Sequence, residues 1–482
     1  MDKMTDTKYF LAIDIGASSG RHILAHIEDG KICLEEMYRF SNGMDDEAGH
    51  KIWNINRLFS EIKEGMKMCA LAGKAPVSMA IDTWAVDYVL LDDKDMMLGP
   101  CFAYRDIRTE NMDEEVYKLI SEKELYSRTG IQKAIFNTIY QLMSVKCNHP
   151  EWLDKAETLL MVPDYLNFLL TGVKKQEYTN ASTTQLVNAE RCSWDRDLIS
   201  RLGFPQKIFK EISEPGTVVG NLKQDIRKEL GFDCLVILPA THDTGSAVMS
   251  VPSTDEDILY ISSGTWSLLG TELKEPDTSQ DAANANFTNE GGYDHRYRFL
   301  KNIMGLWMIQ SVQKEFIQGV NGFDPRDDYS FGNICKKASH TDISSVVDAN
   351  DQIFLAPESM IEAIKIKCTE TGQKVPESPW EIARVIYRSL AVCYKNAVKE
   401  MESITNKKYS TIHIVGGGSK AEWLNELTAQ ETGLKVTAGP GEATAIGNIG
   451  AQLIYAGVYK DLYAFRKGVA ESFSVRDYIY KK

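Results

Sequence analysis

Apolar and polar positions alternate along much of the first forty residues. The run YFLAIDIG leads into a small-residue turn, GASSG, and then into the alternating run RHILAHIE. A DG dipeptide separates that run from another alternating stretch, KICLEEMYRF. Alternation with a period of two, bounded by glycine turns, is typical of strands joined by tight connections. The pattern therefore predicts a β-meander over residues 8–40.

The remainder of the first half mixes helical and extended patterns. A helix is predicted at about 56–72, and VSMAIDTWAVDYVLLDD (77–93) is predicted to form a strand that continues into a second strand or a hairpin. Residues 110–230 are predicted to be largely helical. A short strand at 234–238 then leads into the polar stretch THDTG.

The second half begins with a polar break, VPSTDED, at 251–257. The elements predicted after it are a strand, a Gly-Ser turn and a strand in DILYISSGTWSLLGTEL, a helix at about 302–318, an irregular region to about 375, a long helix at about 377–405, a strand, glycine turn and helix at 410–433, a short strand in KVTAG, and a small-residue helix in GEATAIGNIGAQLIYAG.

An internal repeat links the two halves. FLAIDIGASSGRHIL and ILYISSGTWSLLG share an order of strand, small-residue turn and strand. Strands alternate with helices over the whole chain, which predicts an α/β protein. The repeat and the polar break together predict two domains of similar design, residues 1–250 and 251–482.

Composition narrows the class of protein. Of the 482 residues, 43% are hydrophobic and 25% are charged, as in globular proteins with a large core. The net charge of −14 argues against a nucleic acid or an anionic membrane as partner, because both need a basic surface. The net charge does not argue against a small phosphorylated ligand, because such a ligand needs only a few hydrogen-bond donors at its site. Oligomeric state cannot be predicted.

Localisation is predicted from the N-terminus, the apolar runs and the thiols. Met1–Lys8 is polar and Asp14 interrupts the next apolar run, so no signal peptide is expected. No run of 18 uncharged apolar residues predicts a membrane span. Nine cysteines occur without a C-x-x-C spacing. Reduced, mostly buried thiols in a cytoplasmic protein are the simplest interpretation.

Three glycine-rich turns follow apolar strands: Gly16–Gly20, Ser262–Thr265 and Gly416–Gly418. Such turns let backbone N–H groups approach a phosphate without obstruction by side chains. A single one is more often only a turn, but three in the same setting favour a nucleotide site. The P-loop pattern, the G-x-G-x-x-G pattern and a zinc-ligand pattern are all absent.

Two carboxylates stand at strand ends near these turns. Asp14 lies within LAIDIG, and Asp243 follows His242 in THDTG. A carboxylate among apolar residues is costly unless it is paired or binds a metal. The structural alternatives are that Asp243 caps a helix, that His242 packs under the loop, and that Asp14 bonds to its own turn. At a helix start, the dipole would favour the ionised form of Asp243.

A third polar cluster, IDTWAVD, surrounds Trp84. A tryptophan flanked by acids suits the apolar face of a sugar. From the residues alone, a core tryptophan is the favoured interpretation.

Taken together, these stretches resemble the sugar kinases of the FGGY family, which share the fold of actin, hexokinase and the heat-shock ATPases. The resemblance is carried by AIDIGASSGR (12–21), IDTWAVDYVLLD (81–92), AYRDIRT (103–109), MVPDYLNFLLTG (161–172), EYTNASTTQLVN (177–188), HDTGSAV (242–248), SSGTWSLLG (262–270), NEGG (289–292), FLKNIMGLWMIQ (299–310), IHIVGGGS (412–419) and ATAIGNIG (443–450).

The resemblance implies two ribonuclease-H-like domains with ATP and a sugar in the cleft between them. It implies phosphate or nucleotide binding by Ala17, Ser18, Ser19, Gly20, Arg21, Thr265, Gln310, Gly416, Gly417 and Gly418. It implies sugar binding by Trp84, Ala85, His242, Asp243, Thr244 and Asn302. Asp243 is the implied general base, and Asp14 with Asp243 would hold Mg²⁺ through water.

Within the family, GASSGR, EYTNASTTQLVN and LKNIMGLW resemble the branch whose members phosphorylate L-rhamnulose. One departure is Ala85, where the family pattern usually has glycine. An alanine there either changes little or narrows the sugar pocket. A kinase for another ketose, such as L-fuculose or D-xylulose, is therefore an alternative. A non-catalytic sugar- or nucleotide-binding protein on the same fold is a further one.

Overall fold

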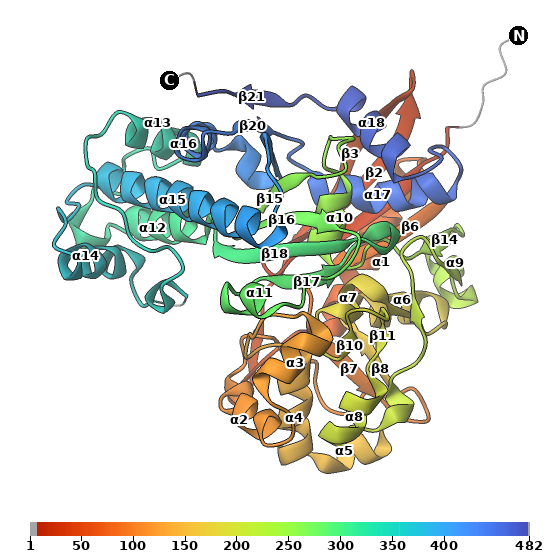
Figure 1. Ribbon diagram of the computed structural model, residues 1–482. Helices are drawn as coiled ribbons and strands as arrows, with labels where there is room; N and C mark the ends of the chain where they lie inside the picture. The colour runs from red at the N-terminus through yellow and green to blue at the C-terminus, as the bar shows by residue number, and fades with distance from the viewer. Residues whose placement is uncertain (1–6, 356, 481–482) are drawn as a thin grey trace, which may run out of the picture. The chain divides into compact units, whose positions relative to one another are not determined.

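The structure is a computed structural model that describes residues 7–355 and 357–480 (Figure 1). The expectation about a signal peptide falls mostly on residues 1–6, outside the described residues. Two compact units are present. Unit 1 contains the described residues of Met1–Ser250, Leu273–Phe299 and Ala443–Ser472, and unit 2 those of Val251–Glu272, Leu300–Glu442 and Phe473–Lys482. Both units are therefore discontinuous in sequence, and the division of the chain near residue 250 stays a prediction.

A six-stranded sheet in the order β13-β14-β6-β1-β2-β3 forms the centre of unit 1. Its strands are β1 (Phe10–Ile15), β2 (Ser19–Glu28), β3 (Lys31–Ser41), β6 (Ser78–Thr83), β13 (Val218–Asn221) and β14 (Leu235–Ile237). β1 pairs antiparallel with β2 and parallel with β6, and β6 pairs parallel with β14. The predicted meander is confirmed. Every residue of β1 is buried, as its unbroken apolar run predicts.

Helices pack against this sheet within unit 1. They are α1 (Ile55–Leu71), α6 (Val162–Thr171), α9 (Gln224–Leu230), α10 (Asp243–Met249), α17 (Ala443–Tyr455) and α18 (Leu462–Ser472). Asn54 caps α1 by accepting a hydrogen bond from the backbone N–H of Arg57. α17 packs against β1, β6 and α10. Its glycines permit this approach: a Cβ on Gly447 would lie 1.8 Å from the backbone oxygen of Ser246 in α10.

A largely helical part of unit 1 lies together in the lower half of Figure 1. It contains α2 (Met112–Tyr117), α3 (Glu122–Thr129), α4 (Thr138–Asn148), α5 (Pro150–Lys155), α7 (Tyr178–Ser182) and α8 (Arg196–Leu202). Smaller elements are β4 (Asp45–Glu47), β5 (His50–Ile52), β7 (Tyr88–Leu91), β8 (Thr158–Met161), β9 (Gln176–Glu177), β10 (Val187–Asn188), β11 (Ser193–Trp194), β12 (Ile212–Ser213), α11 (Gln280–Asn284) and β17 (Thr288–Gly291). β7 pairs with β8 rather than with β6, so the predicted second strand of 77–93 belongs to another sheet.

One ion pair ties α3 to the start of α8. The Arg128 guanidinium donates to both carboxylate oxygens of Asp195, at 2.8 and 2.6 Å, and Asp195 also caps α8 by accepting from the Leu198 N–H. Burial opposes the ionisation of Asp195, but Arg128 and the cap outweigh it, so the pKa of Asp195 lies below its usual value.

We expect Asp195→Asn to lower the free energy of unfolding by about 1–3 kcal/mol at pH 7, because the charged partner of Arg128 is lost. A carboxyl with a lowered pKa stabilises the fold above its unfolded pKa and loses this effect as the pH falls through its folded pKa. The loss in melting temperature should therefore be larger at pH 7 than near pH 3. Asp197→Asn is the control, since that carboxylate contacts the same arginine but is 64% exposed. An equal loss in both variants would contradict the assignment.

In unit 2, five strands follow the order β16-β15-β19-β20-β21. They are β15 (Leu259–Ser263), β16 (Trp266–Leu273), β19 (Thr411–Val415), β20 (Lys435–Ala438) and β21 (Arg476–Tyr478). β15 pairs antiparallel with β16 and parallel with β19, as β1 does with β2 and β6. The internal repeat predicted from the sequence is thus a repeat of strand pairing.

The helices of unit 2 are α12 (Trp307–Ile317), α13 (Phe331–Ser339), α14 (Met360–Glu370), α15 (Pro379–Thr405) and α16 (Glu422–Thr432). The long α15 contacts α12, α13 and α16 (Figure 1). Ser378 and Glu381 form a capping box at its start, and Asn406, with φ of 55°, ends it in the left-handed region.

Two sequence predictions are corrected here. The helix expected at 302–318 begins only at Trp307, because Tyr297–Met304 forms β18. The region expected to be irregular up to residue 375 contains α13 and α14. The two helices were missed because they have only nine and eleven residues, and so short a segment contains too few turns for its period to be recognised.

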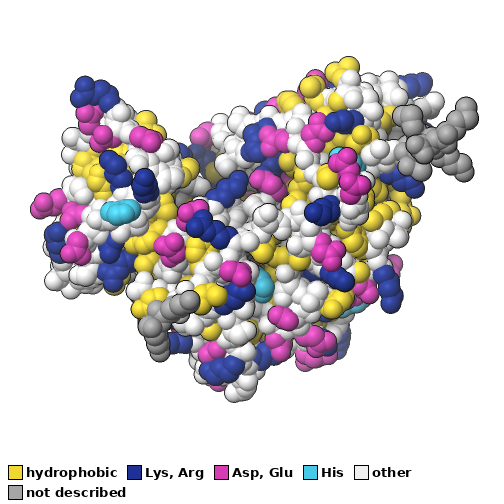
Figure 2. Space-filling view, turned by 90° about the horizontal axis from the view of Figure 1, so that it is seen from above, with side chains coloured by type: hydrophobic (Ala, Val, Ile, Leu, Met, Phe, Trp, Pro, Cys, Tyr) yellow, Lys and Arg dark blue, Asp and Glu magenta, His cyan; other side chains and the backbone are white. Residues whose placement is uncertain are grey.

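The thiols and the surface agree with the composition. All nine cysteines are free, and six of them are buried. Among the described residues, no helix is long and apolar enough to cross a membrane. Figure 2 shows lysines and arginines interspersed with acidic side chains over the face in view.

Candidate functional site

The turn after β14 places the His-Asp pair at the start of α10. His242 is the residue before the helix and makes no side-chain cap, and Asp243 is the first helical residue. This corrects the alternative in which Asp243 caps the helix. The Thr83 N–H donates to the Thr241 carbonyl at 2.9 Å, and Thr83 bridges His242 in parallel register. The end of β6 therefore holds the pair in place.

Three carboxylates gather at this edge of the unit 1 sheet. Asp14 on β1 lies opposite Asp82 on β6 in the parallel register, and both interact electrostatically with Asp243. The carboxyl ends of parallel strands meet at one edge of a sheet, which is where α/β proteins bind ligands. The sequence singled out Asp14 and Asp243. Asp82 was noticed only as a neighbour of Trp84.

Burial dominates the ionisation of two of these acids. It raises the pKa of Asp243, with a further rise from Asp14 and opposing contributions from His242 and Thr244. Burial and the charge of Asp14 raise the pKa of Asp82 well above its usual value, although Asn448 of α17 donates to Asp82 at 2.6 Å. The sequence predicted that the helix start would favour the ionised form of Asp243. In the structure, desolvation outweighs that effect.

The hairpin between β1 and β2 carries the first predicted phosphate turn, Ala17–Arg21. Its conformation is fixed by hydrogen bonds from Gly16 N–H to the Ser19 carbonyl and from Asn42 N–H to the Ser18 carbonyl, both 2.9 Å. A Cβ at Gly20 would lie 2.1 Å from the Phe40 ring, so any other residue there would have to displace that ring. Arg21 donates to one oxygen of Asp14 through Nε and Nη2, at 3.0 and 2.8 Å. The structure thus joins a predicted phosphate ligand to a predicted metal ligand.

The substrate residues predicted around Trp84 have different environments. Trp84 is 7% exposed and packs on Trp53 with ring centroids 4.0 Å apart. Both indole N–H groups donate to Asp87 Oδ2, at 2.9 and 2.6 Å. Burial raises the pKa of Asp87 to about 6, against several hydrogen bonds that lower it. Asp87 is therefore a structural acceptor, and Ala85 is the partly exposed member of this segment.

In unit 2, close packing joins the other two glycine turns. A Cβ on Gly418 would lie 1.9 Å from Ser263 Oγ, and one on Gly416 would lie 2.9 Å from the Ser263 carbonyl oxygen. Gly417 has open space around it. The exposed Thr265 follows this serine, so the SSGT and GGG turns lie side by side.

The start of α12 also meets the SSGT turn. The backbone N–H groups of Leu306 and Trp307 donate to the carbonyls of Gly264 and Thr265, at 3.0 and 3.1 Å. Gln310 is partly exposed one turn further along α12. Asn302 is partly exposed on β18 and belongs to unit 2. Unit 2 therefore contains Thr265, Gln310, Asn302 and the GGG turn, and unit 1 contains the other predicted site residues.

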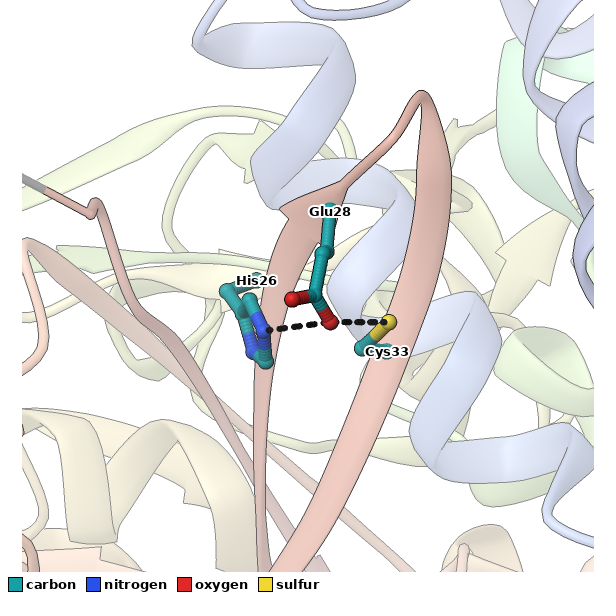
Figure 3. A group of neighbouring side chains, drawn as sticks. All are labelled: His26, Glu28 and Cys33. Atoms are coloured by element: carbon teal, nitrogen blue, oxygen red, sulfur yellow. Dashed lines mark hydrogen bonds and ion pairs between the residues drawn. The ribbon is translucent and has the colours of Figure 1, made fainter. Parts of the chain in front are cut away.

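A separate group of possible metal ligands lies on the β2–β3 hairpin. The ligand atoms of His26, Glu28 and Cys33 all lie within 4.8 Å of one another, and Glu28 faces both of the others in Figure 3. The Glu28 side chain is 71% exposed, and the described residues add no fourth His, Cys, Asp or Glu to the group. The group lies toward the opposite end of β2 from Arg21.

Two side chains that the sequence analysis did not select contact His242. They are Glu290 on β17 and Arg298 on β18, both buried and both in unit 1. Glu290 falls within the NEGG stretch, but nothing in its spacing relates it to His242. Only the packing of distant segments brings Glu290 and His242 together.

The structure contains two hairpins of the same pairing, each with a glycine turn, and it places carboxylates at the carboxyl edge of parallel strands. These features agree with the carbohydrate kinase fold that the sequence resembles. Family models agree: the N-terminal domain of the "FGGY family of carbohydrate kinases" matches residues 9–250, and its C-terminal domain matches residues 259–456. The chain belongs to the FGGY family of carbohydrate kinases.

Among curated proteins, the chain is 50% identical to "Rhamnulokinase" of Oceanobacillus iheyensis over 97% of both chains. It is 49% identical to "Rhamnulokinase" of Halalkalibacterium halodurans over 98% of both. Among solved structures, gluconate kinase from Lactobacillus acidophilus has a TM-score of 0.79 at 17% identity, covering 99% of this chain and 94% of that one. At that identity the likeness concerns the fold alone, and it confirms the predicted α/β kinase fold.

Proposed function

We propose that the protein transfers the γ-phosphoryl group of ATP to L-rhamnulose, forming L-rhamnulose 1-phosphate in the catabolism of L-rhamnose. The observation that carries the chemistry is Asp243, a partly exposed carboxylate at the start of α10 that interacts electrostatically with Asp14 and Asp82. The choice of sugar is supported by relatives named rhamnulokinase at 50% and 49% identity over nearly the full chain.

The mechanism follows from what phosphoryl transfer needs, which is positioning and neutralisation of charge. Asp243 accepts the proton of the attacking sugar hydroxyl. Backbone N–H groups of the turn at Ala17–Gly20, and of the turns around Thr265 and Gly417, bind phosphate oxygens. Gln310 lies near the nucleotide.

The donor set fits Mg²⁺, which prefers oxygen ligands and retains water molecules. Asp14 and Asp243 would hold the ion through water, and Asp82 lies opposite Asp14 on the neighbouring strand β6. When bound, the ion neutralises charge on the phosphates. Arg21 meanwhile keeps one oxygen of Asp14 in place through its two hydrogen bonds.

Sugar selection is proposed to depend on His242, Thr244, Asn302 and the segment at Ala85. Trp84 contributes mainly by supporting that segment, because its ring packs on Trp53. A kinase for another ketose is the second candidate, favoured only by Ala85 in place of the family's usual glycine. A cytoplasmic location, as expected for an enzyme that uses ATP, belongs to the same proposal.

The test is ATP- and Mg²⁺-dependent phosphorylation of L-rhamnulose, L-fuculose, D-xylulose, L-ribulose and glycerol by purified protein. We expect kcat/KM for L-rhamnulose to exceed that for each other acceptor at least about tenfold, the ratio produced by a difference of about 1.4 kcal/mol in transition-state binding. Preference for another ketose would overturn the choice of sugar and leave the reaction class in place. Ala85→Gly restores the residue that is usual in the family and tests whether this alanine affects the choice of sugar. If the sugar contacts only the backbone at this position, the order of kcat/KM among the acceptors should stay unchanged.

A further inference from the structure

Arg298 is a fully buried guanidinium that contacts the histidine of the site. Its side chain is 0% exposed. Nε donates to the Gly291 carbonyl at 2.8 Å, Nη1 lies 3.1 Å from Glu290 Oε2, and Nη2 lies 2.9 Å from His242 Nδ1. A buried charge is costly unless it is paired and hydrogen-bonded. An arginine that is paired with Glu290 therefore contacts Nδ1 of His242.

Glu290 is the anion that holds this arginine. Burial alone would raise the pKa of Glu290, but the charge of Arg298 and the contact with His242 outweigh it and lower the pKa. The carboxylate side chain is 9% exposed. Glu290 and Arg298 therefore form a buried ion pair behind the site.

The hydrogen-bonding groups around His242 determine which imidazole nitrogen carries the proton. A guanidinium carries only N–H donors, so a hydrogen bond between Arg298 and His242 Nδ1 requires a lone pair on Nδ1. A proton on Nδ1 could be offered to Glu290 Oε2 at 3.3 Å, but it would then face an N–H of Arg298 at 2.9 Å. The neutral ring thus carries its proton on Nε2, which lies 3.4 Å from Asp243 Oδ1.

We propose that Arg298, held by Glu290, is a positioning residue that fixes His242 in the Nε2–H tautomer. In this state His242 has no lone pair to offer at the site, so it acts as a hydrogen-bond donor and Asp243 is the base of the pair. The sugar oxygen that meets His242 must be an acceptor, and the hydroxyl that meets Asp243 must be a donor. The proposal rests on the proposed function for its consequence in catalysis but not for the tautomer itself.

The tautomer is measured on substrate-free protein labelled with ¹⁵N-histidine, in which imidazole nitrogen shifts distinguish a protonated nitrogen from one with a lone pair. The chain has eight histidines, and His242→Gln assigns the signal of interest. We expect wild-type His242 to show a protonated Nε2 and an accepting Nδ1. A proton on Nδ1 in the wild type would overturn the proposal, whatever the variants do.

Arg298→Met tests the cause. Without the guanidinium, Nδ1 can donate to Glu290, so the tautomer should change to Nδ1–H. The kcat for the ketose should fall about 10- to 100-fold, the effect of losing one hydrogen bond to a charged group, while the KM for ATP stays within about twofold. Arg128→Met removes another paired arginine of unit 1 and should lower stability without moving the His242 signals. An unchanged tautomer in Arg298→Met would contradict the proposal.

The two proposals fail separately. If none of the ketoses is phosphorylated but His242 shows the expected tautomer and its change, the assignment of function fails and the role of Arg298 stands. If L-rhamnulose is the preferred acceptor and the tautomer is the opposite one, the function stands and the role of Arg298 fails.

Discussion

Asp243→Asn is expected to lower kcat about 10²- to 10⁴-fold, the contribution that a positioned general base typically makes. The carboxylate is suited to this role because it is one-third exposed, with 33% of its side chain accessible. Its Oδ1 accepts from the Thr244 N–H at 2.5 Å and the Thr244 hydroxyl at 3.1 Å. These contacts orient the group, and an asparagine of the same shape cannot accept the proton.

The same variant should remain folded and should not lose stability. Burial raises the pKa of Asp243 in the folded protein, so the folded state binds this proton more tightly than the unfolded state does. Ionisation of the group therefore costs stability as the pH rises through the shifted range, and a neutral asparagine avoids that cost. We expect the melting temperature at pH 7 to be equal to or higher than that of the wild type.

The control is Asp225→Asn, which makes the same change at an exposed residue in the first turn of α9. It should leave both kcat and melting temperature unchanged. Activity of Asp243→Asn within about threefold of the wild type would remove Asp243 as the base, because the effect expected of a base is at least about 10².

Gly447→Ala is expected to be the most destabilising single-methyl substitution that the structure suggests. Its Cβ would lie 1.8 Å from the Ser246 oxygen and 2.6 Å from the Ser246 carbonyl carbon, and backbone atoms cannot turn aside as a side chain can. Overpacking typically costs about 1–3 kcal/mol and occasionally more. We expect about 3 kcal/mol or more, measured by urea denaturation, because α17 must move away from α10.

Gly332→Ala gives a matched control for this prediction. Gly332 is also in a helix, and a Cβ there would meet no heavy atom within 4 Å. Alanine is the better helix former, so this variant should gain up to about 1 kcal/mol. A Gly447→Ala protein as stable as the wild type would mean that α17 and α10 pack less closely than described.

Much of the fold could be predicted from local patterns. The hairpins at residues 8–40 and 257–273 each begin with an apolar run that ends in a glycine-containing turn, and both were recognised together with their similarity. β18 was missed because YRFLKNIM runs directly into an apolar helix, and a short apolar run has no period that separates strand from helix. Local patterns also could not predict that the units are discontinuous in sequence, because this depends on which distant segments pack together.

The site was predicted only in part. Asp14 and Asp243 could be found because a carboxylate among apolar residues is unusual and stands out in a strand. Arg298 gives no such signal, since an arginine is mostly exposed and is seldom fully buried unless it is paired. Its contact with His242 joins residues 56 positions apart in the chain, and such a contact depends on how distant segments pack together.

The discontinuous make-up of unit 1 has a consequence for synthesis on the ribosome. Asp82 and Ser78 meet their partners Asn448 and Gln452 only after α17 has been translated. The roughly 190 residues that separate Ser250 from Ala443 take on the order of 10–40 s to translate at ordinary rates. Throughout that time the nascent sheet lacks the helix that covers β1 and β6. The first unit to emerge is therefore among the last parts to be completed, and the face that α17 covers stays exposed until translation is nearly finished.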